Sequence, residues 1–368
     1  MNSTNERLFA KADEVRAAAT ALGFDAVGVA RADVSLDRDN VMYETFVGAG
    51  MHGEMAYLAK NAGVRERLDG EGILPGARSV ICVARRYGVA SSSSSASSSS
   101  TSTTNSIAAY ARGRDYHGFL RKRLRRLASF VRSLGTPDEP VLARPLCDVE
   151  PVLEREWAAR AGLGFVGKNG MLIVPGLGSM VLLGEVVTTL DLVGAAPRVP
   201  LHERCGSCTR CLDACPTRAF VAPFVLDPRR CVSYLTIEHR SAISPELREA
   251  VGEHLFGCDD CQTVCPFNAG GRAQAPLAED DPFVPLERWS RLRLEALLAL
   301  DDASWDVLAE GTPLKRAGRG GLARNAAIVL GNRGDRSSLE ALGAAAQNHP
   351  DPIVRDAAAW AAARIQER

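Results

Sequence analysis

The chain has 368 residues, of which 46% are hydrophobic and 24% are charged. At roughly 150 residues per domain, this length predicts two or three domains. The 44 Lys and Arg residues equal the 44 Asp and Glu residues, which excludes a protein whose overall charge attracts nucleic acid or membrane lipids, so a basic surface can only be local.

The N-terminal sequence MNSTNERLFAKADEVRAAATALGF has the pattern of an amphipathic helix and lacks the long apolar run of a signal peptide. No run of eighteen apolar residues occurs anywhere in the chain. We therefore expect a soluble cytoplasmic protein that does not contact a membrane. We also expect a monomer.

The first 90 residues have the pattern of an α/β domain. A helix is predicted over 5–23, and β-branched runs predict strands over 24–32 and 77–90. The serine-rich segment at 91–106 has no side chains that could fill a core. We expect a mobile surface insertion there.

A second helix is predicted over 117–135, where apolar residues recur at helical spacing and arginine and lysine cover the remaining surface. This basic surface is either a solvated face or a patch that contacts phosphates. A third helix over 150–161 precedes a glycine-rich turn and the strand-like runs at 171–174 and 180–190.

The C-terminal region contains two similar helical segments. Residues from Leu322 and from Ile353 align at an offset of 31, with Arg324 opposite Arg355, which indicates stacked helical hairpins of HEAT type. Residues 312–368 hold nine Arg and Lys against five Asp and Glu. This tail is the better candidate for docking an anionic partner.

Eight of the ten cysteines lie between Cys205 and Cys265. In a chain without a secretory signal, such crowding favours metal or redox chemistry over a disulfide framework. The remaining two are Cys82 and Cys147, and Cys82 lies in an apolar run that is typical of a buried core.

The sequence CGSCTRCLDACP at 205–216 has the spacing of a bacterial ferredoxin motif, in which three cysteines bind one four-iron cluster and the fourth binds another. A second run, CDDCQTVCP at 258–266, lacks its first cysteine because Leu255 stands there, and Cys231 can replace it. We predict two [4Fe-4S] clusters rather than a zinc ribbon, which needs no third and fourth cysteine. The predicted ligands are Cys205, Cys208, Cys211 and Cys265 for cluster 1, and Cys215, Cys231, Cys258 and Cys261 for cluster 2.

The glycine-rich sequence GLGFVGKN at 162–169 fits a dinucleotide motif and nearly fits a phosphate loop. It follows a helix instead of a strand, and Asn169 stands where the phosphate loop needs Ser or Thr, so neither activity is predicted. Such a turn beside a cavity could still let a bulky ligand approach the backbone closely.

Four carboxylates lie just upstream: Asp148, Glu150, Glu154 and Glu156. A carboxyl group in an apolar pocket can have a raised pKa and act as a proton donor. Glu154 and Glu156 are more simply surface charges on a helix, and Asp148 could be a helix cap. The residues alone do not decide among the four.

The combination of motifs resembles the epoxyqueuosine reductases, which are cobalamin-dependent iron–sulfur enzymes of tRNA queuosine synthesis. The motifs are MHGEMAYL at 51–58, YARGRDYH at 110–117, DVEPVLEREWAARAGLGFVGKNGMLI at 148–173, both cysteine runs, and CVSYLTIEHR at 231–240. The resemblance covers nearly the whole chain apart from the serine-rich insertion.

This resemblance implies an α/β + α architecture in three parts. Residues 1–195 would form a corrinoid-binding α/β domain related to reductive dehalogenases, 196–285 a ferredoxin-like domain with two clusters, and 286–368 a HEAT-like domain that docks tRNA. The implied substrate is epoxyqueuosine in a tRNA anticodon loop, and an external donor of ferredoxin or flavodoxin type supplies electrons. Basic residues near 112–126 and 315–336 would hold the flanking phosphates.

The resemblance also assigns roles to residues. Asp148 would be the proton donor. The implied cobalamin contacts are Tyr57, Asp148, Lys168, Asn169, Val232, His239, Cys258 and Asp259. His117 is expected to be a structural, hydrogen-bonding residue and not a cobalt ligand, because Leu120 replaces the glycine of the common D-x-H-x-x-G signature.

Two other functions fit parts of the pattern. One is a corrinoid iron–sulfur reductase that acts on a small molecule, as reductive dehalogenases do. The other is an electron-transfer protein without catalytic activity.

Overall fold

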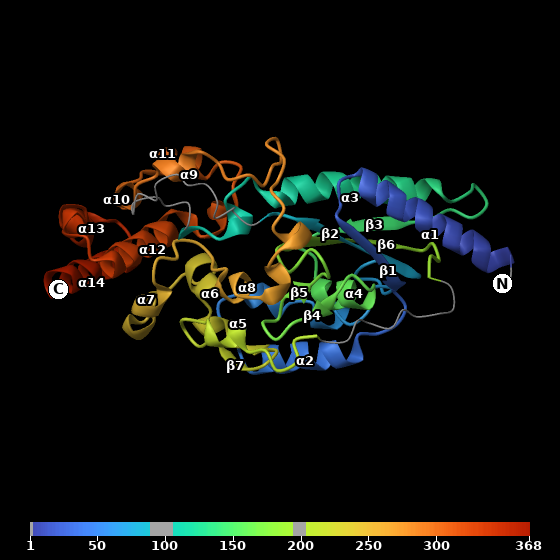
Figure 1. Ribbon diagram of the computed structural model, residues 1–368, viewed down its shortest axis with the longest axis horizontal. Coiled ribbons are helices and arrows are strands. Elements are labelled where there is room, and N and C mark those ends of the chain that lie inside the picture. The colour runs from blue at the N-terminus through green and yellow to red at the C-terminus, as the bar shows by residue number, and fades with distance from the viewer. Residues whose placement is uncertain (1–2, 89–105, 194–203) are drawn as a thin grey trace.

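The computed structural model describes residues 3–88, 106–193 and 204–368. The predicted serine-rich insertion at 91–106 lies outside these ranges except for Ser106. The N-terminal helix and the C-terminal helices lie at opposite ends of the long axis (Figure 1).

A four-stranded antiparallel sheet forms the N-terminal part, in the order β1-β2-β6-β3. Its strands are β1 (Ala26–Arg31), β2 (Ser79–Arg86), β3 (Ala143–Leu146) and β6 (Val181–Thr188). β2 and β6 are central, and Glu185 of β6 is paired with Cys82 on one side and Leu146 on the other. The predicted strands at 24–32, 77–90 and 180–190 are therefore confirmed.

Helices cover both faces of this sheet (Figure 1). α1 (Ser3–Ala21) and α3 (Tyr116–Ser133) pack on one face, where they meet Ile81 and Val83 of β2. α4 (Glu154–Arg160) packs on the other face with Val80 and Cys82. The alternation along β2 follows from the two-residue period of a strand. α2 (Asp37–Gly48) lies in the connection between β1 and β2.

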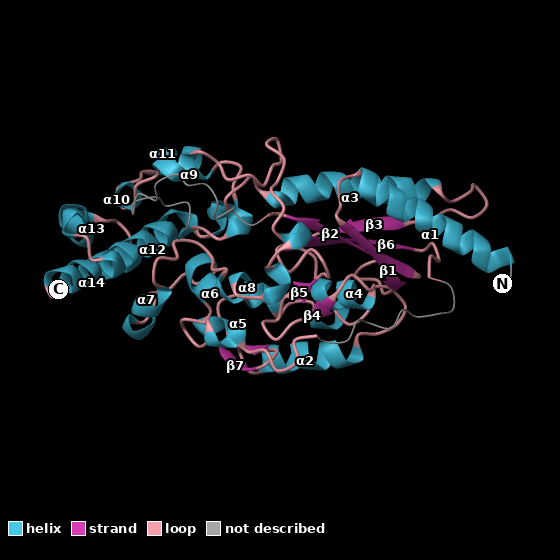
Figure 2. Ribbon diagram, in the orientation of Figure 1, coloured by secondary structure: helices cyan, strands magenta, loops and turns pink. Residues whose placement is uncertain are grey.

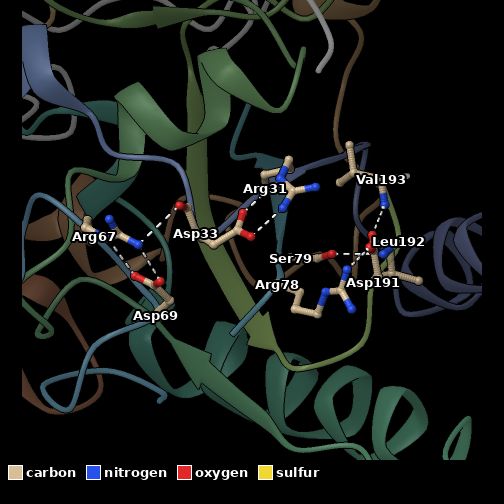
Figure 3. Close-up of polar contacts among 9 residues, drawn as sticks. All are labelled: Arg31, Asp33, Arg67, Asp69, Arg78, Ser79, Asp191, Leu192 and Val193. Carbon is tan, nitrogen blue, oxygen red and sulfur yellow. Dashed lines mark hydrogen bonds and ion pairs between the residues drawn. The ribbon is translucent and has the colours of Figure 1, made fainter. Parts of the chain in front are cut away.

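Ion pairs hold one end of the sheet together (Figure 3). Arg78, just before β2, pairs with Asp191 after β6 at 2.7 Å, and the Ser79 hydroxyl accepts a bond from the Leu192 amide at 2.9 Å. Arg31 binds Asp33 at the end of β1. These contacts fix the point where the chain leaves the sheet toward the cysteine region.

The cysteine region consists of short elements around two loops. They are α5 (Arg210–Asp213), β7 (Phe220–Ala222), β8 (Val225–Leu226), α6 (Val232–Ile237), α7 (Pro245–Val251) and α8 (Asp260–Thr263). The small hairpin of β4 (Phe165–Val166) and β5 (Leu172–Ile173) packs against it through Phe165, Ile173 and Cys265. Apart from the main sheet, the described strands occur only in these two small hairpins (Figure 2).

The C-terminal part is helical. Its helices are α9 (Arg288–Arg291), α10 (Leu294–Leu297), α11 (Asp302–Ala309), α12 (Gly318–Arg333), α13 (Leu339–Asn348) and α14 (Pro352–Gln366). α12 packs along α14, and the two predicted repeat helices lie within them. One apolar core continues from Leu235 and Phe256 of the cysteine region into Ala326 and Val329 of α12.

The predicted α/β + α class is confirmed. The helical spacing of apolar residues predicted α3 correctly. Four of these residues, Leu120, Leu124, Leu127 and Val131, are fully buried in the structure. None of the helices in the described ranges is long and apolar enough to cross a membrane.

Candidate functional site

The cysteines are available as metal ligands. All ten lie in the described ranges and none is in a disulfide. The eight predicted ligands come from two loops that α5 and α8 bring into contact, with Cys231 supplied from the residue before α6.

The first predicted ligand group combines the two loops. Cys205 and Cys265 pack against the same apolar residues, Phe165 and Ile173. Burial raises the pKa of the Cys211 thiol, and the neighbouring Cys265 and Cys208 raise it further. The structure thus places Cys265 of the second loop among the cysteines of the first loop.

The second predicted group is crossed in the same way. Burial raises the pKa of the Cys231 thiol, and Cys215 of the first loop contributes. Burial also raises the pKa of Cys261, with contributions from Cys231 and Cys215. Cys258 lies beside Cys231 in the adjoining apolar core.

This sulfur set suits iron–sulfur clusters. Burial raises the pKa of the Cys211, Cys231, Cys258 and Cys261 thiols, and bound cations reverse that effect by stabilising thiolates. Two groups of four thiols, each drawn from both loops, match the two-cluster ferredoxin pattern and exceed the needs of one zinc ion.

A histidine and a carboxylate lie beside one of the cysteines. The His254 Nε2 atom is 3.8 Å from the Cys258 Sγ and 3.1 Å from an Asp260 carboxylate oxygen. Sequence analysis did not identify His254. An N–H group at this position can donate to the sulfur of a cluster ligand, which is one means by which proteins adjust cluster potentials.

The glycine-rich turn supports the cysteine loops. The Lys168 Nζ donates to the carbonyl oxygens of Gly206 and Cys208, and the Asn169 amide donates to the Cys261 carbonyl at 3.3 Å. A Cβ atom on Gly164 would lie 2.0 Å from the Ile173 carbonyl. Gly164 therefore serves the packing of the β4–β5 hairpin.

Asp148 occupies an unusual turn. Its φ is +65°, and the Val149 amide donates to the Cys147 carbonyl at 2.7 Å, which closes a three-residue turn around it. A positive φ in such a turn is uncommon for a residue other than glycine, and strain of this kind is concentrated at functional sites.

Two neighbouring glutamates hold this turn. The Asp148 amide donates to Glu154 Oε1 at 2.8 Å, and the Cys147 amide donates to Glu150 Oε2 at 2.9 Å. Burial raises the pKa of Glu154 to about 7. The interpretation of Glu154 as a surface helix charge is therefore wrong, whereas Glu156 has no contact with the turn among the described hydrogen bonds.

The Asp148 side chain is half exposed and is bound by two donors at one oxygen. Its Oδ2 accepts the Tyr116 hydroxyl at 3.1 Å and lies 2.7 Å from the His117 Nε2. The His117 bond lowers the pKa of Asp148, and the more distant Arg316 charge lowers it further. The carboxyl group with a raised pKa is thus Glu154, and Asp148 is an anion that is paired with His117.

The C-terminal part reaches this site through the 3-10 helix η8 (Pro313–Arg316). Arg316 binds both carboxylate oxygens of Glu238 at 2.8 and 2.9 Å and lies over the Tyr57 ring at 5.3 Å. Tyr57 is 46% exposed. Sequence analysis counted Arg316 only as one of several basic residues, because its neighbours are distant in sequence.

The other residues implied for cobalamin are more enclosed. Val232 is 2% exposed, Asp259 accepts the Ala109 amide at 2.7 Å, and His239 is bound to Tyr234 and to the Ala242 carbonyl. Tyr57 and Asp148 are thus the exposed side chains among the predicted contacts, and Val232, Cys258 and Asp259 could contribute backbone atoms.

Several predicted phosphate-binding arginines have structural roles. Arg324 is 1% exposed and binds three backbone carbonyls, Arg112 binds the Ile107 carbonyl, and Arg333 pairs with Glu253. For Arg324 the proposed phosphate contact is wrong, because its guanidinium group is buried. The exposed basic residues of these two segments include Arg121, Lys122, Arg125, Lys315 and Arg336.

Three family models match the chain. Residues 204–268 match the 4Fe-4S double cluster binding domain, 67–148 match "Epoxyqueuosine reductase QueG, DUF1730", and 314–368 match HEAT repeats. The predicted double-cluster and HEAT-like regions are confirmed by these matches.

A curated relative decides the family. The epoxyqueuosine reductase of Gloeobacter violaceus is 41% identical over 328 residues, which cover 88% of this chain and 97% of the relative. The chain belongs to the epoxyqueuosine reductase family. The eight clustered cysteines and the Asp148 turn therefore belong to a member of this enzyme family.

Solved structures of the family have the same fold. A crystal structure of an epoxyqueuosine reductase with a tRNA-Tyr epoxyqueuosine-modified stem loop has a TM-score of 0.85 and 30% identity, and the match covers 97% of this chain and 91% of that chain. An epoxyqueuosine reductase from Bacillus subtilis, described with its catalytic aspartate loop swung out of the active site, has a TM-score of 0.83, 30% identity and the same coverage.

Proposed function

We propose that this chain reduces epoxyqueuosine to queuosine in the anticodon loop of tRNA. The observation that supports this function most directly is the full-length match to an epoxyqueuosine reductase structure with an epoxyqueuosine-modified stem loop. The accessible Asp148 turn beside the double-cluster region gives that reaction an acid and an electron source in one place.

The reaction needs two electrons and two protons, because the epoxide oxygen leaves as water and an alkene remains. A [4Fe-4S] cluster passes one electron at a time, so the two clusters would relay the two electrons singly. We propose Cys205, Cys208, Cys211 and Cys265 as the ligands of cluster 1, and Cys215, Cys231, Cys258 and Cys261 as the ligands of cluster 2.

Cobalamin is the further cofactor that the family resemblance implies. The exposed side chains of Tyr57 and Asp148 are available to such a group, and we propose that the backbone of Val232, Cys258 and Asp259 contributes further contacts. Lys168, Asn169 and His239 use their polar atoms within the protein, so we assign them to holding the cysteine loops and not to the corrin. Bound cobalamin would supply the reducing centre that acts on the epoxide.

Asp148 is proposed as the acid that protonates the departing oxygen. Expelling an unprotonated oxygen anion into a site with little water is costly, so a positioned donor lowers the barrier. The positive φ of Asp148 projects its side chain out of the turn, and the bonds from Tyr116 and His117 both go to Oδ2. The other oxygen, Oδ1, is then the one for the substrate.

The tRNA is proposed to dock across the helical part. An anticodon loop is single-stranded, so the modified base can turn outward without breaking a duplex. The exposed Lys315 and Arg336 on one side and Arg121, Lys122 and Arg125 on the other are the proposed phosphate contacts. The corresponding domains are 1–195, 196–285 and 286–368.

The remaining partners are proposed from the chemistry. Single-electron cluster reduction requires an external donor of ferredoxin or flavodoxin type. We place the activity in the cytoplasm, where tRNA is available, and propose that one chain acts as a monomer.

The decisive experiment incubates the anaerobically reconstituted protein with cobalamin, reductant and tRNA that carries epoxyqueuosine. Nucleoside mass analysis should show the loss of one oxygen. The Asp148→Asn variant should keep about eight irons per chain and its cobalamin absorbance, while its turnover falls by about 100-fold or more. Wild-type protein that retains both cofactors but produces no queuosine would exclude this function, and an active Asp148→Asn variant would exclude Asp148 as the acid.

A further inference from the structure

We propose that His117 stores the proton that Asp148 delivers and reloads Asp148 within each turnover, and that Asp115 orients the imidazole for this task. The inference rests on the proposed function, because it assigns the source of the protons in that reaction. His117 is a positioning and proton-supplying residue in this scheme, and Asp148 remains the group that meets the substrate.

The proton balance requires such a store. Removal of the epoxide oxygen breaks two carbon–oxygen bonds and forms one carbon–carbon double bond, with two electrons supplied by the reduced iron–sulfur clusters. Both protons end on the same oxygen, which leaves as water. A single carboxyl group delivers one proton at a time, so Asp148 must be recharged between the first and the second transfer.

His117 is bound through both ring nitrogens. Its Nε2 lies 2.7 Å from Asp148 Oδ2, and its Nδ1 lies 2.7 Å from Asp115 Oδ1. Two carboxylates, one at each ring nitrogen, hold the imidazole in one orientation and favour its doubly protonated form. The contact with Asp148 thus provides a direct path for a proton.

The start of α3 fixes this geometry. Asp115 is the N-cap of the helix, and its side chain also accepts the His117 backbone amide at 3.0 Å. The Tyr116 ring is stacked on the imidazole, with 4.1 Å between the ring centroids. Because these contacts come from three consecutive residues, the imidazole has little freedom to turn away from Asp148.

The charges agree with storage on the histidine. The bonds from Asp115 and Asp148 raise the pKa of His117 to about 9, and the bond from His117 lowers the pKa of Asp148. At neutral pH the pair is an imidazolium and a carboxylate. A growing negative charge on the substrate oxygen would draw the His117 proton onto Asp148 Oδ2, and rotation of the carboxyl group about its Cβ–Cγ bond would then present that proton to the substrate oxygen.

The proton can be replaced from water. The side chains of His117 and Asp115 are 29% and 39% exposed, so solvent reaches both of them. The titratable and charged groups that surround His117 and Asp148 come from several elements. They are Tyr116 and Arg121 on α3, Asp115 just before α3, and Tyr57, Tyr110, Glu154 and Arg316.

A purely structural role for His117 makes a different prediction. If the imidazole only holds Asp148 in position, then removal of Asp115 should weaken binding or stability without moving the pH dependence of the chemical step. The pH profile of the chemical step separates these roles, and an NMR titration tests the ionisation state that the relay requires.

The first measurement is an NMR titration of the full-length, nitrogen-15 histidine-labelled protein, with the His117 signal assigned by its loss in His117→Gln. The wild-type imidazole should titrate near pH 9, as its two carboxylate bonds require. Asp115→Asn and Asp148→Asn should each move that value toward the ordinary histidine pKa of about 6.5. A wild-type imidazole that titrates near 6.5 would overturn the proposal whether or not the protein is loaded with cofactors.

The second measurement is the pH profile of kcat for the loaded enzyme with epoxyqueuosine tRNA. Activity should be full below the His117 pKa and should fall as the pH rises through about 9, because the imidazolium loses its proton there. In Asp115→Asn the fall should move toward neutral pH. In His117→Gln, kcat at pH 8 should drop by about 100-fold while KM for tRNA stays within about twofold.

The Glu287→Gln change, at the exposed residue just before α9, provides a control for charge removal, and its profile should match the wild type. An alkaline limb that stays in place in Asp115→Asn would contradict the relay. If wild-type protein makes no queuosine at any pH while the NMR titration gives the raised value, the proposed function fails, and the imidazolium between its two carboxylates is established without a role in that reaction.

Discussion

The fold determines the ionisation states of several individual side chains in this protein. Glu185 is the clearest case. It is fully buried in the central strand β6, and neither carboxylate oxygen has a hydrogen-bond partner among the described residues. Burial raises the pKa of Glu185 far above its ordinary range, and nearby Glu154 adds to the effect. The group is therefore a neutral acid at physiological pH.

Glu185→Gln tests this state. A glutamate in the unfolded chain ionises above about pH 4.3, whereas Glu185 in the folded chain keeps its proton, so stability is full below that pH and declines as the pH rises. The variant should lose this decline and become more stable relative to wild type between pH 5 and 8, by up to roughly 1.4 kcal/mol per pH unit.

Urea denaturation at pH 5 and pH 8 measures the difference. Glu287→Gln on the exposed surface is the matched control, and its effect should not change with pH. A constant difference between Glu185→Gln and wild type would mean that Glu185 is ionised in the folded protein.

At the residue scale, the cysteine spacing predicted the double-cluster region that the family model confirms, because each loop brings its own sulfurs together locally. The assignment of individual cysteines to each cluster stays a prediction. The protonation states were different. The hydrogen bonds from His117 and Tyr116 lower the pKa of Asp148, and the burial of Glu154 depends on its neighbours in space, so no local pattern could indicate either.

At the scale of elements, α12 connects two regions through one buried arginine. Arg324 donates to the carbonyl oxygens of Leu235, His239 and Ser241 at 2.6 to 2.8 Å. These carbonyls lie in and just after α6, so α12 closes the end of that helix. The repeat alignment placed Arg355 at the equivalent position of α14, but Arg355 binds the carbonyls of His349 and Pro350 close to its own helix.

Arg324→Met should therefore lower the free energy of unfolding by roughly 2–4 kcal/mol, because three buried carbonyl groups lose their donor. Arg355→Met should cost about 1 kcal/mol, since its contacts are local and partly exposed. Guanidinium denaturation of the two variants provides the comparison. Equal losses of unfolding free energy in the two variants would show that the stabilisation by each arginine depends on its position in the repeat and not on burial between α6 and α12.

The positions of the main helices and strands could be predicted from the sequence, but the pairing of the strands could not. Hydrophobic periodicity identified α3, α12, α14 and the long strands. It did not indicate that β2 would pair with β6, nearly one hundred residues later, or that the short β3 would complete the sheet. Strand order depends on contacts between strands that are far apart in the sequence. The residues of one strand do not specify which other strand it will pair with.

For the whole molecule, the candidate site is assembled from three regions of the chain. The Asp148 turn follows β3, Tyr57 lies in the connection after α2, and Arg316 comes from the helical part (Figure 1). Arg316 joins Tyr57 to Glu238 of the cysteine region, so a segment of the part that the resemblance assigned to tRNA docking also contributes to the candidate site.

Arg316→Gln should weaken the retention of cobalamin by about three- to tenfold, because Tyr57 loses the cation over its ring and Glu238 loses a paired donor. Arg316→Lys should have an intermediate effect, since it keeps the charge and loses the two-point contact. Equilibrium dialysis followed by absorbance measures retention. The iron content should not change in either variant, and unaltered retention in Arg316→Gln would remove this residue from the cofactor site.

The sequence by itself determined the cluster chemistry, the positions of the main helices and strands, and the family, because cysteine spacing, hydrophobic period and motif order are local properties of the chain. Only the tertiary structure decided the partners of Asp148, the burial of Arg324 and the role of Arg316. Each of these depends on groups that are distant in sequence, and the free energy of a charge is determined by the groups that surround it in space.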